Sequence, residues 1–93
     1  MSGSQDLAAL RRRMDELNER LTALLHERAA LARQIGRCKR GASLPAQDPA
    51  REQDELASAI AARPDDGFTE AQLQSILGEV IAASRALVAE PET

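Results

Sequence analysis

The stretch LAALRRRMDELNERLTALLHERAALARQIGRCK, residues 7–39, decides the fold of this chain. Its apolar side chains recur in steps of three and four residues, at Leu7, Leu10, Met14, Leu17, Leu21, Leu24, Leu31, Ile35 and Cys38. This spacing is typical of one long helix that packs against other helices along an apolar seam. The pattern breaks once, because Arg28 stands where the seam demands an apolar residue. That arginine needs a partner, since an unpaired buried charge is too costly to keep.

The composition favours the all-α class. The chain has 93 residues, of which 43% are apolar, and Phe68 is its only Phe, Tyr or Trp residue. Abundant Ala, Leu, Glu and Arg favour helices over strands. We expect a single domain over residues 1–93. A chain of this length buries only about 60–65% of its unfolded surface, so association with a second copy would add stability.

The net charge of −3 gives no indication of nucleic-acid binding. Basic residues nevertheless gather between Arg11 and Arg40, which leaves local cations for a small anion. The N-terminus lacks the apolar segment of a signal peptide, and no run approaches the roughly 18 apolar residues of a membrane span. We therefore expect a cytoplasmic protein that does not contact a membrane. Cys38 has no cysteine to pair with, and its position in the seam favours a small core residue.

The first helix is predicted to begin near Ser4 or Gln5 and to run to about Arg40. Its interior contains no proline, and its first glycine is Gly36. Residues 1–5 are expected to form a frayed tail around that start, and Gly41 is the expected stop. Some 34 residues at 1.5 Å each give a length of about 50 Å.

Two shorter helices are predicted after a loop. Asp48 is followed by proline, which predicts a capped helix start, and this helix is expected to end near Ala62. Thr69 and Gln72 have the spacing of a capping box, so a third helix should run from there to near Ala89. Helices of about 21 and 30 Å are too short to cover both flanks of the long seam. We therefore predict an intertwined two-fold homodimer whose long helices pair antiparallel.

Each predicted helix has one polar residue where its pattern asks for an apolar one. These residues are Arg28, Glu52 and Ser84. Each has an ordinary explanation when taken alone. An arginine can extend to solvent, a glutamate can favour a helix N-terminus, and a serine can bond to its own helix. Together they describe a polar chamber inside an apolar bundle.

The spacing of the cations indicates what the chamber would bind. Arg28 and Lys39 are 11 residues apart on nearly one helix face, so they could bracket a ligand within about 16 Å of helix. Arg11 shares that face but lies about 42 Å from Lys39, so it could serve only a partner's chamber in an antiparallel dimer. With Arg51 and Glu52 added, the chamber would suit a compact dianion that bears a hydroxyl or an amine. No metal-ligand set, phosphate loop or Ser-His-Asp triad is evident in the sequence.

An ordered set of residues resembles a known family. The set comprises Leu10-Arg11, Leu24-Leu25, Glu27-Arg28-Ala29, Leu31-Ala32, Ile35-Gly36, Lys39, Asp48, Arg51-Glu52 and Ser84. In this order and spacing it resembles the all-helical chorismate mutases, and the likeness covers most of the chain. The resemblance implies an intertwined three-helix homodimer that rearranges chorismate to prephenate without a cofactor. It also implies an isomerase of aromatic amino acid biosynthesis, in the shikimate pathway.

The resemblance assigns roles by position. Arg28 and the partner's Arg11 would clamp the two substrate carboxylates, and Lys39 would donate to the ether oxygen of the breaking bond. Such an enzyme would favour the compact conformer of its substrate and stabilise charge on that oxygen.

The second and third helices would meet the substrate ring. Glu52 and the backbone at Asp48 would receive the ring hydroxyl, and Arg51 and Ser84 would complete the polar lining. Many family members have Gln or Glu one turn after the Ser84 position, as a second donor to the ether oxygen, whereas this chain has Val88. Losing such a bond costs about 1–3 kcal/mol, or roughly 10- to 100-fold in rate.

Val88 leaves several alternatives open. Lys39 could act alone, Arg85 or a partner protein could compensate, or the substrate could be a relative of chorismate. Mutases of 4-amino-4-deoxychorismate and isochorismate-pyruvate lyases share the fold, and Glu52 could receive a hydroxyl or an ammonium. The sequence does not indicate whether a larger synthase activates the enzyme. A non-enzymatic helical dimerisation module is the alternative outside the enzyme class.

Overall fold

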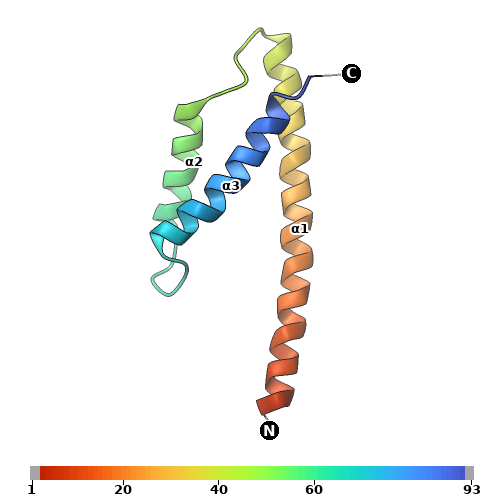
Figure 1. The fold of residues 1–93 in the computed structure, drawn as a ribbon, viewed down its shortest axis with the longest axis vertical. Coiled ribbons are helices and arrows are strands. Elements are labelled where there is room, and N and C mark those ends of the chain that lie inside the picture. Colours follow the sequence, from red (N-terminus) through yellow and green to blue (C-terminus); the bar gives the residue numbers. More distant parts are fainter. Residues whose placement is uncertain (1–2, 92–93) are drawn as a thin grey trace.

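Three helices make up the protein in the computed structural model, which describes residues 3–91 (Figure 1). They are α1 (Gly3–Gly41), α2 (Pro49–Ala61) and α3 (Glu70–Val88). No strand occurs within residues 3–91, so the prediction of an all-α fold with one long and two shorter helices is confirmed.

The long helix begins at Gly3, within two residues of the predicted start near Ser4 or Gln5. The expectation of a tail was wrong for residues 3–5, which are helical, while residues 1 and 2 lie outside the described part of the chain. Asp6 lies in the first turn, where a carboxylate interacts favourably with the helix dipole.

The end of α1 agrees with the prediction within a residue, although another residue adopts the capping conformation. Gly41 belongs to the helix and has a negative φ, whereas Ser43 adopts the left-handed conformation with a φ of 56°. The amide of Ser43 donates to the carbonyl of Arg40 at 3.1 Å, and that of Leu44 donates to the carbonyl of Lys39 at 2.8 Å. These two bonds form a Schellman motif, which satisfies the last carbonyls of the helix. The helix thus ends at Gly41 as predicted, but Ser43, two positions later, supplies the left-handed residue.

Both shorter helices start where their capping residues predict. The Asp48 side chain accepts a hydrogen bond from the Arg51 amide at 3.2 Å. Thr69 and Gln72 form the full capping box, since the Gln72 amide donates to Thr69 Oγ1 at 3.1 Å and the Thr69 amide donates to Gln72 Oε1 at 3.0 Å. The predicted starts of α2 and α3 are thus confirmed, and both ends agree within a residue.

The third helix joins the other two. It crosses the molecule diagonally and packs against both α1 and α2, while the described backbones of α1 and α2 do not touch each other (Figure 1). Ala32 of α1 and Ile81 of α3 are the buried apolar residues at the centre of this packing. The N-terminal half of α1 projects beyond the other helices.

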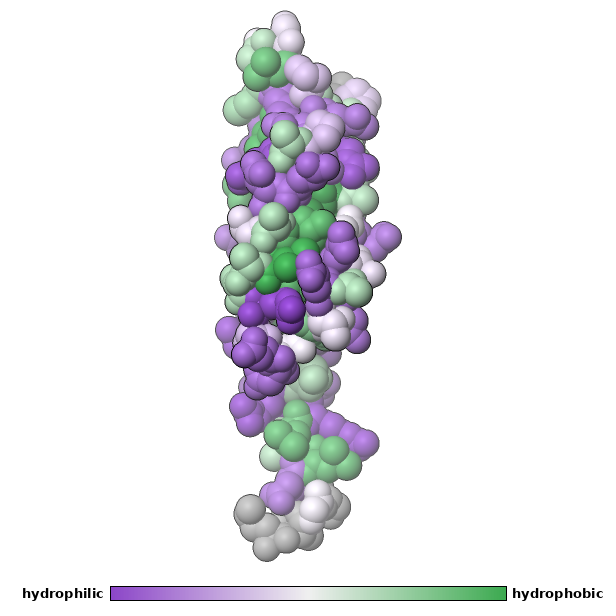
Figure 2. Space-filling view, turned by 90° about the vertical axis from the view of Figure 1, so that its left-hand side faces the viewer, coloured by the Kyte–Doolittle hydropathy of each residue, from purple (hydrophilic) through white to green (hydrophobic). Residues whose placement is uncertain are grey.

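The apolar seam of α1 is exposed in the single chain. Its leucines, Met14 and Ile35 keep between 47% and 61% of their surface exposed. Figure 2 shows apolar side chains at the surface of the lower part of the molecule, which α1 forms alone. Cys38 is exposed as well, so the prediction that it is a core residue is wrong for the single chain. The three helices of one chain leave most of the seam uncovered.

The end of α3 packs closely against α1 at Gly36. A Cβ atom built there would lie 2.5 Å from the carbonyl oxygen of Val88 and 3.2 Å from Arg40 Nη1. The first distance is too short for any side chain, and the obstacle is backbone. Glycine is therefore required at this position if the C-terminal end of α3 is to stay against α1.

We predict that Gly36→Ala destabilises the protein by about 1–3 kcal/mol, because α3 must move away from α1 to admit the methyl group. Gly78→Ala in α3 is the matched control, since a Cβ there meets nothing within 4 Å and the change adds helix propensity. Urea unfolding at a fixed protein concentration measures both variants. A Gly36→Ala protein with the midpoint of the parent chain would contradict the close packing described here.

Candidate active site

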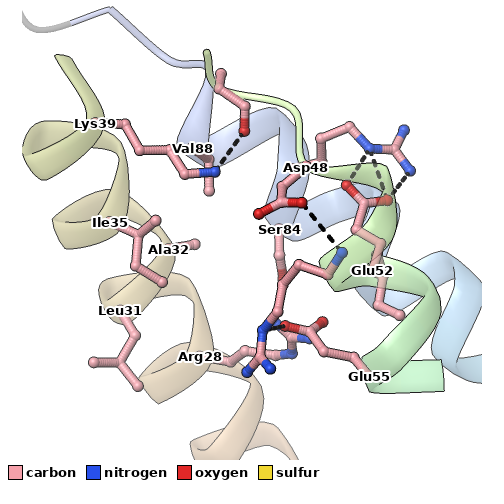
Figure 3. Close-up of a pocket in the computed structure, with 14 residues that line it drawn as sticks. Arg28, Leu31, Ala32, Ile35, Lys39, Asp48, Glu52, Glu55, Ser84 and Val88 are labelled. Atoms are coloured by element: carbon pink, nitrogen blue, oxygen red, sulfur yellow. Dashed lines mark hydrogen bonds and ion pairs between the residues drawn. The ribbon is translucent and has the colours of Figure 1, made fainter. Parts of the chain in front are cut away.

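A pocket of about 470 Å³ lies between the C-terminal half of α1, the start of α2 and the end of α3 (Figure 3). Leu31, Ala32, Ile35 and Ile81 supply apolar walls. Every site residue predicted from the sequence, apart from Arg11, lines this pocket: Arg28, Lys39, Asp48, Arg51, Glu52, Ser84 and Val88.

Arg28 has partners on both neighbouring helices. Its Nη1 donates to Ser84 Oγ of α3 at 3.2 Å, and its Nη2 donates to Glu55 Oε2 of α2 at 3.2 Å. The Ser84 hydroxyl in turn donates to the carbonyl of Val80 at 2.9 Å, which leaves its oxygen free to accept from the arginine. Arg28 therefore points into the pocket as predicted, and its charge is paired there.

Glu55 is a pocket residue that the sequence analysis missed. Its carboxylate binds Arg28 and also forms an ion pair with Arg51, whose Nε lies 3.3 Å from Glu55 Oε1. Glu52 is the one carboxylate that the sequence predicts in the chamber, whereas Asp48, Glu52 and Glu55 all line the pocket. The signal that could have found Glu55 is its spacing of four residues from Arg51, which puts both side chains on one face of α2.

Glu52 and Arg85 form a bidentate ion pair. Arg85 Nη2 lies 2.8 Å from Glu52 Oε1, and Arg85 Nε lies 3.0 Å from Glu52 Oε2. The hydrogen bonds from Arg85 hold the pKa of the Glu52 carboxyl below its ordinary value, although burial acts in the opposite direction. The same bonds raise the pKa of Arg85. Both groups are therefore charged at neutral pH, and the pair weakens only in acid, as the pH falls through the lowered pKa of Glu52.

Lys39 lies at the opposite wall from Glu52, on α1. Its Nζ donates to the carbonyl of Ala46 in the loop between α1 and α2 at 3.0 Å (Figure 3). An ammonium has three donors, so two remain for a ligand. Asp48 also lines the pocket, and its side chain caps α2 by accepting a hydrogen bond from the Arg51 amide.

Arg11 lies apart from the pocket of its own chain. It belongs to the projecting N-terminal half of α1 and is exposed. This placement agrees with the prediction that Arg11 does not serve its own chamber.

The pocket has a small excess of positive charge. Arg28, Lys39, Arg51 and Arg85 face the three carboxylates, which leaves one net positive charge in an apolar surround. The fold and this site define a small all-helical protein with a pocket of net positive charge. A family model described as chorismate mutase type II matches residues 10–89. The chain therefore belongs to the chorismate mutase type II family, and it is an enzyme of the isomerase class.

Known proteins similar to this chain agree with that assignment. The structure of chorismate mutase (form II) from Thermus thermophilus has a TM-score of 0.87 and 32% sequence identity, over 95% of this chain and 99% of that one. Form I of the same protein has a TM-score of 0.81 and 34% identity, over 85% of this chain and 98% of that one. A bifunctional chorismate mutase/prephenate dehydratase from Aquifex aeolicus is 42% identical over 50 residues, which are 54% of this chain but 14% of that protein.

None of the helices in the described part of the chain is both long and apolar enough to cross a membrane.

Proposed function

We propose that this protein converts chorismate to prephenate, by a [3,3]-sigmatropic rearrangement without a covalent intermediate. The observation that carries the proposal is the placement of Arg28 and Lys39 on one wall of the pocket with Glu52 on the other. Chorismate has two carboxylates, an ether oxygen and a ring hydroxyl. The pocket offers a cation for a carboxylate, a donor for the ether oxygen and an acceptor for the hydroxyl.

The chemistry needs no proton transfer or nucleophile. The pocket would hold the side chain of the substrate over its ring in the compact conformer, which removes most of the entropic part of the barrier. Lys39 would then stabilise the negative charge that develops on the ether oxygen as the bond breaks. Val88 contributes only an apolar wall, so the proposed site depends on the Lys39 ammonium for this step.

The remaining polar groups would fix the orientation of the substrate. Arg28 would bind one carboxylate, helped by Ser84, which already receives one of its N–H groups. Glu52 and the backbone at Asp48 would receive the ring hydroxyl, and Arg51 would complete the lining.

The second carboxylate of chorismate is a reason to propose a homodimer. One net positive charge does not match a dianion, and Arg11 of a second copy would bring the excess to two. The exposed seam of α1 offers a surface for such a copy, because its burial would remove a row of leucines from water. We propose an antiparallel pairing of the long helices, in which each Arg11 completes the pocket of the partner.

We expect the purified protein to form prephenate from chorismate, measured as phenylpyruvate after acid treatment. Lys39→Ala should lower kcat by at least about 100-fold, because it removes the charged donor to the ether oxygen. Arg37→Ala is the control, since it removes a neighbouring cation that does not line the pocket. A parent protein that leaves chorismate unchanged would refute the proposed function.

The cross-chain role of Arg11 predicts complementation. Arg11→Ala and Lys39→Ala chains should each be inactive alone, but an equal mixture should regain about a quarter of the parent activity after subunit exchange. Half of the dimers are then mixed, and each mixed dimer has one intact pocket. If verified exchange restores no activity, Arg11 does not act across chains.

Glu55→Gln should lower KM for chorismate about 3- to 10-fold at low ionic strength. The variant keeps the shape of the side chain but releases Arg28 and adds one net positive charge to the pocket. The gain should shrink as salt is added. Asp54→Asn controls for a lost surface carboxylate outside the pocket. An unchanged or higher KM for Glu55→Gln would show that Glu55 positions Arg28 rather than competing for it.

A further inference from the structure

Glu52 already has a cationic partner inside the pocket. Arg85 reaches it from α3 with two nitrogens, and the two side chains keep only 40% and 24% of their surface exposed. Both residues line the pocket. The carboxylate proposed to meet the substrate ring is thus neutralised before any substrate arrives.

We propose that Arg85 makes the site selective for a ring hydroxyl over a ring ammonium. This inference rests on the proposed function, because it concerns which member of one substrate class the pocket accepts. It makes Arg85 a specificity-determining residue, which acts on the ring substituent through its ion pair with Glu52.

The Glu52 carboxylate can accept more hydrogen bonds than Arg85 donates to it. An ionised carboxylate offers about four lone-pair positions on two oxygens. The guanidinium of Arg85 contacts both oxygens but leaves positions on each. A neutral hydroxyl can donate to one of them, and it meets no electrostatic penalty from Arg85.

An ammonium at the same place meets a different field. A charged amine bonded to Glu52 would lie a few ångströms from the guanidinium, and the two positive charges would share one negative charge. Like charges at such separations disfavour each other by about 10- to 100-fold in a partly solvated site.

No second carboxylate is available to offset that repulsion within the described residues. Glu55 is engaged by Arg28 and Arg51, and the Asp48 side chain caps α2. The remaining charged lining group, Lys39, is itself a cation. An ammonium on the ring would therefore raise the positive charge of this wall with nothing nearby to balance it.

The test compares kcat/KM for chorismate and for its 4-amino analogue, whose ring carries an amine in place of the hydroxyl. The parent protein should favour chorismate at least about 10-fold at neutral pH. Arg85→Gln should reduce that preference about 10- to 100-fold, since it leaves Glu52 with an unbalanced negative charge. Arg85→Lys, which keeps the charge, should retain most of the preference.

Glu52→Gln should move the preference the other way, further toward chorismate, because it leaves the Arg85 charge without its counter-ion. If the two variants shift the preference for chorismate in opposite directions, the ion pair controls selectivity and is not merely structural. Glu52→Gln still tests the proposal if Arg85→Gln fails to fold. Arg63→Gln, far from the pocket, is the control for a lost arginine.

The outcomes are distinguishable. A parent protein without activity on chorismate overturns the proposed function and this inference with it. An active parent protein that prefers the amino substrate overturns only the selectivity. So does a preference for chorismate that neither Arg85→Gln nor Glu52→Gln changes from that of the parent protein. An equal loss of kcat on both substrates in Arg85→Gln also overturns it, and would make Arg85 a donor to the reacting oxygen instead.

Discussion

The architecture depends on the pairing of one partly buried guanidinium with groups from both neighbouring helices. Arg28 interrupts the seam of α1 and keeps 36% of its side chain exposed, so its charge is only partly removed from water and is stabilised by partners. Its two terminal nitrogens bind Ser84 of α3 and Glu55 of α2, so the charge links all three helices at one point. The pocket forms around this junction. Packing and site are consequently not separate regions of the molecule.

The charges of the pocket are nearly balanced, and the imbalance has a definite place. Glu55 is shared by Arg28 and Arg51, and Glu52 is matched by Arg85. Lys39 bonds only to a neutral carbonyl among the described residues, so the excess positive charge is centred on its ammonium. In the proposed reaction this is also the group that meets the developing negative charge. A site arranged in this way concentrates its field where the bond breaks.

The parts of the fold that follow local rules could be predicted from the sequence. Asp48 and Thr69 start their helices through contacts within three residues, and the apolar repeat of residues 7–38 predicts one long helix. The end at Gly41 was predicted too, but Ser43 adopts the left-handed conformation that glycine usually supplies. Arg28 was found because it breaks a repeat.

The pairings across helices could not be predicted. The bond between Arg85 and Glu52 joins residues 33 apart in the sequence, and that between Arg28 and Glu55 joins residues 27 apart. The spacing of Glu55 from Arg51 is a local signal, but no local pattern shows that Glu55 meets Arg28 of α1 or that Arg85 meets Glu52 of α2. Cys38 was predicted to be a core residue but is exposed in the single chain. Its place in the apolar repeat puts it on the seam, and the repeat does not indicate whether one chain alone covers the seam.

The position of α3 between the other two helices also links the range of ligands that the pocket can accept to the stability of the fold. Within residues 3–91, α3 supplies the backbone contacts that hold α1 and α2 at their separation, and Ile81 is both its buried core residue and a wall of the pocket. A lineage adapting to a bulkier ligand would have to trim this side chain, and the same trimming would loosen the bundle. New specificity in such a scaffold would therefore arise more readily at the rim than in its interior.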